Sequence, residues 1–201
     1  MKDFFKKHSY DMVKMFLNQF ATAIFGFSLV LAAGKAESQT LRIATSIGAI
    51  LFYVFLLYTM TWDIGYRDKV SVETGRIRNS PFKGALISLC ANSLNFLLAI
   101  FIMLASLLPE SFISDVGGIS VSVALLLEGM YTGLLAIKLG GVAISSYWFV
   151  YFLLPIPAIV TCFLGYQAGL HDIKLTGFFN YKEPSKAKEK KESADDEASD
   201  L

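Results

Sequence analysis

The sequence predicts an all-α integral membrane protein, and three observations lead to this fold class. First, 54% of the 201 residues are hydrophobic, only 17% are charged, and the mean hydropathy is +0.52, which exceeds what a soluble domain of this length can bury. Second, residues 182–201 hold five of the 18 Lys and Arg and seven of the 17 Asp and Glu, so the rest of the chain is more apolar than the average. Third, four charge-free runs reach the roughly 20 residues with which a helix crosses a bilayer.

Each charge-free run predicts one membrane span. The four runs are 15–34, 43–62, 84–109 and 139–171. They predict transmembrane helices at about 12–33, 41–64, 83–108 and 146–170. The first span follows a basic arm, residues 1–11, and is longer than the apolar region of a typical signal peptide, so we expect it to stay in the protein. Before the third span, Asn79 and Pro81 are typical of a helix start.

A fifth apolar segment, residues 119–137, is interrupted by Glu128. Four crossings place the basic arm, the Arg- and Lys-rich loop 67–83 and the C-terminus together on the cytoplasmic side, as the positive-inside rule requires. We therefore predict a multi-pass protein of the cell membrane with four transmembrane helices plus a re-entrant or interfacial helix at about 119–137, and with both termini cytoplasmic. Five transmembrane helices are the alternative, which would place the Lys-rich C-terminal tail outside.

The last 20 residues differ in composition from the membrane part, which we place at 12–181. Residues 182–201 carry a basic block followed by an acidic one, and a segment with so few apolar residues is predicted to be disordered. The net charge of the whole chain is only +1, so we expect the lipid bilayer as a partner and no nucleic acid.

Small and polar residues recur at helical spacing within the predicted spans, which is typical of faces that pack against other helices. The three stripes are Asn18, Thr22 and Gly26; Ala85, Ser88, Asn92, Asn95 and Ala99; and Ala158, Cys162, Gly165 and Gly169. Two GxxxG pairs, Gly129 with Gly133 and Gly165 with Gly169, predict close helix approach. These faces are compatible with packing inside the chain, against another membrane protein, or in a homo-oligomer.

Glu128 is the sharpest candidate for function, because a carboxylate among leucines needs a partner, water or a proton. At depth it would serve as a proton or cation site, with Thr132 one turn further along; at the membrane interface it would need no special role. Asn92 and Asn95 either line a polar cavity with Glu128 or hold helices together. Asp63, at the end of the second span, is a candidate interface acid with Arg67 four residues later as its partner.

The sequence contains no nucleotide-binding loop, zinc-protease motif, paired-cysteine motif or nucleophile elbow. We therefore expect no catalytic residues, no metal, no cofactor and no enzyme activity. The leading hypothesis is a non-enzymatic accessory or packing subunit of a larger membrane assembly. The alternative is a small oligomeric transporter or channel for an ion or small solute.

Two stretches also resemble a known group of proteins. Asn79, Pro81, Phe82 and Gly84 precede a span, and Pro155 and Pro157 lead to Gly165, Tyr166 and Gly169. In these motifs the chain resembles small multi-spanning membrane proteins of Gram-positive bacteria that carry no assigned activity. The resemblance implies a bacterial cytoplasmic membrane and no functional residues.

Overall fold

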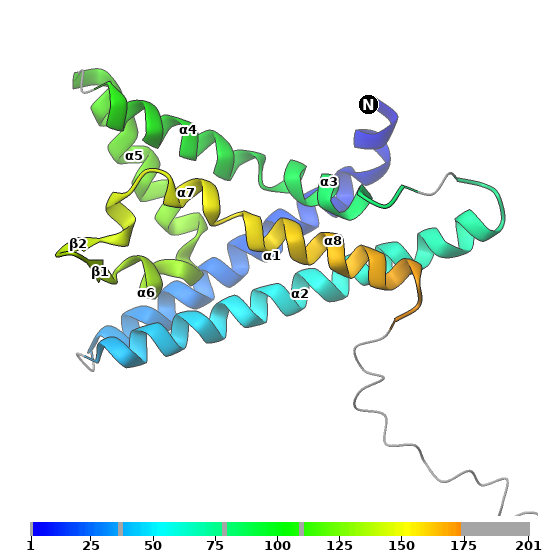
Figure 1. Cartoon of the computed structure of the whole chain (residues 1–201), viewed down its shortest axis with the longest axis horizontal. Helices are drawn as coiled ribbons and strands as arrows, with labels where there is room; N and C mark the ends of the chain where they lie inside the picture. Colours follow the sequence, from blue (N-terminus) through cyan, green and yellow to red (C-terminus); the bar gives the residue numbers. More distant parts are fainter. Residues whose placement is uncertain (1, 36–37, 78–79, 109–110, 174–201) are drawn as a thin grey trace, which may run out of the picture. The chain divides into compact units, whose positions relative to one another are not determined.

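The computed structural model describes residues 2–35, 38–77, 80–108 and 111–173, and these are mostly helical (Figure 1). The α-helices are α1 Lys2–Lys35, α2 Gln39–Glu73, α3 Lys83–Ala91, α4 Ser93–Leu107, α5 Ser111–Leu127, α6 Thr132–Leu135, α7 Val150–Leu153 and α8 Ile156–Leu170. Two 3-10 helices, η1 Gly129–Tyr131 and η2 Ile144–Ser146, and two short strands, β1 Lys138–Leu139 and β2 Val142–Ala143, complete the described elements.

Three helical stretches are long and apolar enough to cross a membrane, namely Phe4–Lys35, Gln39–Glu73 and Val150–Leu170. The helices α1 and α2 extend beyond the predicted spans 12–33 and 41–64, and α1 includes most of the predicted arm 1–11. Charged residues end an apolar run but do not interrupt backbone hydrogen bonding, since Lys and Glu are good helix formers. The membrane span and the helix therefore have different boundaries.

Two further candidate spans are each broken in two. The predicted third span, 83–108, is divided into α3 and α4, whose axes differ by 55°. The segment predicted at 119–137 begins earlier, with α5, and bends by 84° before η1 and α6. The predicted last span, 146–170, consists of α7 and α8, which are separated near Pro155, where proline cannot donate a backbone hydrogen bond.

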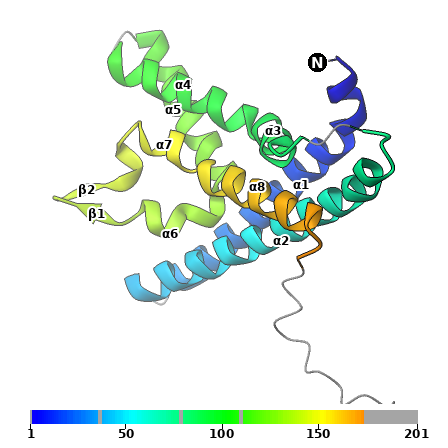
Figure 2. The ribbon, with the colours of Figure 1, turned by 45° about the vertical axis from the view of Figure 1, so that its right-hand side comes forward.

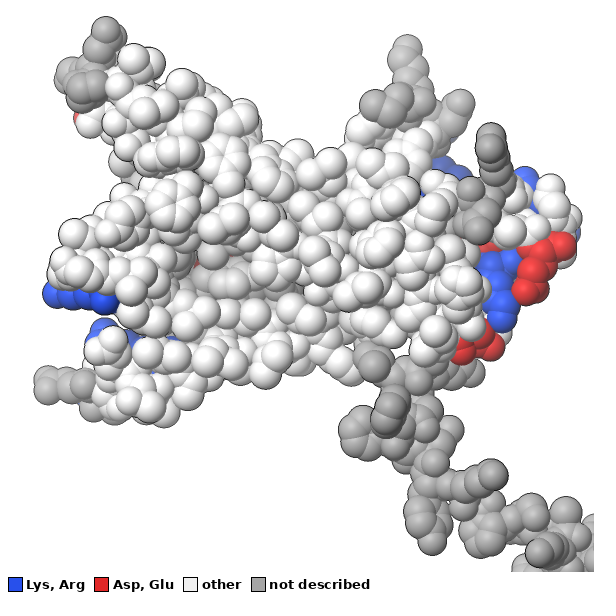
Figure 3. All heavy atoms as spheres, viewed as in Figure 1, with Lys and Arg blue, Asp and Glu red and all other residues white. Residues whose placement is uncertain are grey.

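In the described part of residues 2–171, the long helices α1 and α2 run between two opposite ends of the molecule (Figures 1 and 2). We call the end with the start of α1, the end of α2, the start of α3 and the end of α8 the N-terminal end. The opposite, hairpin end contains the end of α1, the start of α2, the end of α4, the start of α5 and the β1–β2 hairpin. On the face in Figure 3, charged side chains gather at these two ends, and the surface between them is almost entirely uncharged.

Glycines allow the helices to approach closely. A Cβ atom on Gly165 would lie 2.8 Å from the backbone oxygen of Tyr58 in α2, and one on Gly169 would lie 3.0 Å from the Cα of Gly65. Such contacts are too short for any side chain, so α8 lies directly on α2. The predicted close helix approach at Gly165 and Gly169 is therefore confirmed.

A small β-hairpin corrects the purely helical prediction. Strand β1 pairs antiparallel with β2 through Gly140 and Gly141, whose φ angles of 62° and 88° lie in the left-handed region. The predicted tail, 182–201, and Asn79 of the predicted helix start lie outside the described residues.

Candidate functional site

The break between α5 and η1 is a tight corner with Glu128 at its apex. A Cβ on Gly129 would collide with the backbone oxygen of Ala23 in α1, and one on Gly133 would collide with the backbone of α2. The Gly133 N–H also donates a hydrogen bond of 2.8 Å to Ser46 Oγ in α2. The corner therefore packs directly on α1 and α2. It can do so because Gly129 and Gly133 have no side chain at the two contact points.

The Glu128 side chain is buried at this corner and has no hydrogen-bond or ion-pair partner in the part of the chain that the structure describes. The residue is only 4% exposed, and no hydrogen bond or ion pair joins its carboxylate to another described residue. The phenol groups of Tyr53 in α2 and Tyr131 in η1 lie within electrostatic range of it. The Tyr131 hydroxyl is itself buried and has no hydrogen-bond partner within the described part of the chain. Such groups are costly to bury unless a ligand or proton satisfies them.

The two candidate asparagines lie at the other helix break. Asn92 separates α3 from α4, and its Nδ2 donates to the backbone oxygen of Ser88 at 2.9 Å and to Ser88 Oγ at 3.4 Å. Asparagine side chains that bond to nearby backbone compete with the helical pattern, which accounts for a break at this residue. Asn95 Nδ2 donates to Asn92 Oδ1 at 2.9 Å, and the Asn95 Oδ1 atom is buried without a described partner.

Polar groups lie between the two breaks. The Cys162 thiol of α8 lies near the Ser88 side chain, which accepts a hydrogen bond from Asn92. Tyr53 lies within electrostatic range of both Cys162 and Glu128. Among the described residues, no hydrogen bond joins Tyr53 to Glu128 or to Cys162, so these polar groups are neighbours in the core and do not form a continuous hydrogen-bonded path.

Helix α4, which carries Asn95, packs on α5, which precedes Glu128. Gly117 of α5 lies directly against Ala105 of α4, and Ala99 and Leu127 belong to the same buried cluster further along. Asn92 and Asn95 therefore belong to the break between α3 and α4, and Glu128 belongs to the corner between α5 and η1.

The other two candidates are Thr132, next to the corner, and Asp63, on the surface of α2. Thr132 follows the corner, where its hydroxyl donates to the Gly129 backbone oxygen at 2.8 Å, and it lines a groove at the hairpin end. The continuous helical face that would carry both Glu128 and Thr132 does not form. Asp63 is exposed and pairs with Arg67 at 3.3 Å, as the four-residue spacing predicts.

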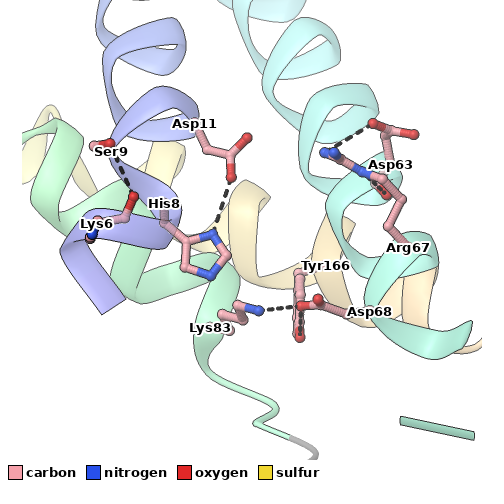
Figure 4. A network of polar contacts seen from close by, with 9 residues as sticks. All are labelled: Lys6, His8, Ser9, Asp11, Asp63, Arg67, Asp68, Lys83 and Tyr166. Carbon is pink, nitrogen blue, oxygen red and sulfur yellow. Dashed lines mark hydrogen bonds and ion pairs between the residues drawn. The ribbon is translucent and has the colours of Figure 1, made fainter. Parts of the chain in front are cut away.

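A buried ion pair at the N-terminal end was not predicted (Figure 4). Asp68 Oδ2 accepts from Lys83 Nζ at 2.5 Å and from the Tyr166 hydroxyl at 2.8 Å. We assigned Asp68 and Lys83 to the polar loop 67–83, but α2 continues through Asp68 and α3 begins at Lys83. Opposite charges at the facing ends of consecutive helices are the sequence signal that predicts such a pair.

The side chains around Glu128 limit the chemistry that this site can perform. Among the described residues, no three His, Cys, Asp or Glu side chains lie close enough together to bind a metal ion. One carboxylate near two phenol groups is suited to exchange a proton or to bind a monovalent cation through oxygen atoms.

Comparison of the chain with protein-family models, with curated proteins and with solved structures gives no match.

Proposed function

We propose that this chain is a small, oligomeric membrane transporter or channel in which Glu128 takes up and releases a proton or binds a monovalent cation. The observation that carries the proposal is a carboxylate only 4% exposed, without a described partner, at an 84° helix break. Ionisable groups inside membrane proteins are rare and generally belong to ion or proton pathways. Discontinuous helices are a common way for transporters to form such sites.

A topology of four crossings suits this function. In this arrangement α1, α2, α3 with α4, and α7 with α8 cross, and residues 111–135 form a re-entrant segment. The proposal is supported by the position of the β1–β2 hairpin, which lies at the same end as the α4–α5 connection (Figures 1 and 2). We assign the N-terminal end, with the basic residues of 67–83, to the cytoplasm together with both chain termini.

The small-residue stripes favour a transporter over an accessory subunit. Gly165 and Gly169 pack on α2, and Gly129 packs on α1. Because these faces are already occupied within the chain, they do not require another protein to cover them. Helix packing accounts for these faces, but it does not account for Glu128, which is buried without a hydrogen-bond or ion-pair partner among the described residues.

Proton flux in liposomes tests the proposal. The full chain is reconstituted with an internal pH-sensitive dye, and a potassium diffusion potential is applied with and without external sodium. We expect the wild-type protein to change the internal pH and Glu128→Gln to reduce this flux to the level of protein-free liposomes, since the amide cannot release a proton. Inhibition of the proton flux by sodium would identify a cation that competes for Glu128.

Asp63→Asn is the matched control, because Asp63 is an exposed acid whose pair with Arg67 contributes little. It is expected to keep the wild-type flux. Flux that Glu128→Gln leaves unchanged, or no flux from the wild-type protein, would overturn the proposal.

An accessory subunit is the second candidate, and the surface of α4 favours it. This helix packs mainly on α5 and leaves large apolar side chains exposed. They are Leu94, Leu97, Ile100, Phe101, Leu104 and Leu107. A second membrane protein that remains bound to wild-type chain after mild detergent extraction, but is lost from Phe101→Ser, would support this function, particularly if liposomes show no flux.

A further inference from the structure

A groove of about 530 Å³ opens at the hairpin end, between α1, α2 and α6. Its wall is mostly aliphatic and includes Val30 and Leu31 of α1 and Ala136, which follows α6. Leu31 is 56% exposed. The groove therefore offers an apolar surface of the kind that a hydrocarbon chain covers.

Basic side chains surround this groove. Lys35 from α1 and Arg42 from α2 line it directly, and Lys138 is exposed on the neighbouring strand β1. Figure 3 shows Lys and Arg side chains on both sides of a hollow at this end. Among the described residues, no ion pair joins any of the three to an acidic side chain.

We propose that this groove binds an anionic phospholipid. The phosphate lies between Lys35 and Arg42, where guanidinium and ammonium groups donate charge-assisted hydrogen bonds to its oxygens. One acyl chain follows α1 toward the middle of the molecule along Leu31 and Val30, which precede Lys35 by one turn. Lys138, two residues after Ala136 of the groove wall, adds a third positive charge for the headgroup.

The combination of surfaces distinguishes a lipid from a water-soluble anion. A soluble phosphate would use the two cations but gain nothing from the aliphatic wall, whereas a phospholipid uses both at once. The site also lies where a headgroup belongs, because the charged end of the molecule meets the uncharged band at this level (Figure 3). The inference does not depend on the function proposed for Glu128.

Native mass spectrometry of the full chain in detergent measures this binding directly. Phosphatidylglycerol and phosphatidylcholine are titrated separately, and glycerol phosphate serves as the soluble probe. We expect one phosphatidylglycerol to bind more tightly than phosphatidylcholine, and glycerol phosphate not to displace it. Lys35→Gln and Arg42→Gln should each weaken phosphatidylglycerol binding by about fivefold, the effect of one basic residue near an anionic headgroup.

Two further variants make the test specific. Arg76→Gln removes an exposed charge at the N-terminal end and should leave the affinity unchanged. Leu31→Ser changes the aliphatic wall without altering charge and should weaken binding of the lipid. Equal binding of the two lipids, displacement by glycerol phosphate, or an equal loss in Arg76→Gln would overturn the proposal.

Discussion

At the scale of single residues, the structure separates buried charges from exposed ones. The side chains of Asp68 and Lys83 are 11% and 10% exposed and are joined by an ion pair to which Tyr166 donates, so α2, α3 and α8 meet at one carboxylate. The exposed pair of Asp63 and Arg67 lies within α2 alone. The two pairs have the same chemistry but different surroundings, and their contributions to stability should differ accordingly.

We expect Asp68→Ala to lower the free energy of unfolding by about 3–5 kcal/mol, because it leaves the Lys83 ammonium buried without its partner. The double variant Asp68→Leu, Lys83→Met should lose less, since it removes both charges together. Thermal unfolding in detergent measures both. As a control, Asp63→Ala should cost no more than about 1 kcal/mol; equal losses at Asp68 and Asp63 would contradict the distinction.

At the scale of elements, helix packing depends on positions without side chains. The Gly169 Cα faces the backbone of α2, where an added Cβ would lie 2.8 Å from the backbone nitrogen of Tyr66. Gly48 belongs to the same α2 helix, but an added Cβ would meet nothing within 4 Å. The two glycines therefore offer a matched comparison between close packing and intrinsic helix propensity.

We expect Gly169→Ala to destabilise the protein by about 1–3 kcal/mol, because α8 must move away from α2 to accept the methyl group. Gly48→Ala should instead be neutral or stabilising by up to about 1 kcal/mol, since alanine favours the helix. Unfolding of the purified protein with increasing SDS compares the two variants. Destabilisation of the same size at both positions would show that α2 and α8 are not in direct contact.

At the scale of the whole molecule, our proposed topology depends on whether the bent segment that contains Glu128 crosses the membrane or re-enters on one side. If residues 111–135 enter and leave on one side, the β1–β2 hairpin and the α1–α2 connection face the same compartment. If the bent segment crosses, the hairpin faces the opposite compartment. The start of α5 and the β1–β2 hairpin lie at the same end of the molecule (Figures 1 and 2), which favours the first arrangement.

Cysteine labelling in intact cells distinguishes these topologies, using a membrane-impermeant maleimide and a background in which Cys90 and Cys162 are replaced by alanine. We expect Gln39→Cys and Leu139→Cys to be labelled from outside, because both lie at the hairpin end. Glu73→Cys, at the N-terminal end, should be labelled only after the membrane is permeabilised. Labelling of Leu139→Cys together with Glu73→Cys would instead support five crossings.

The sequence by itself determined the features that depend on local composition. Charge-free runs predicted the helical, membrane-type chain, and the spacing of Gly165 and Gly169 predicted a close helix contact, because a three-residue gap places both on one helical face. Glu128 was conspicuous as an acid in an apolar segment. The pair between Asp63 and Arg67 also follows from spacing alone.

The tertiary structure decided what depends on contacts between distant segments. The depth of Glu128 is set by Gly129 and Gly133 packing on α1 and α2, and its nearness to Tyr53 has no counterpart in sequence spacing. Likewise, Asp68 meets Lys83 and Tyr166 only after three helices have assembled. Hydropathy depends only on how apolar each segment is. The burial of a side chain and its partners depend on which segments pack together, and in this chain that packing forms the candidate site.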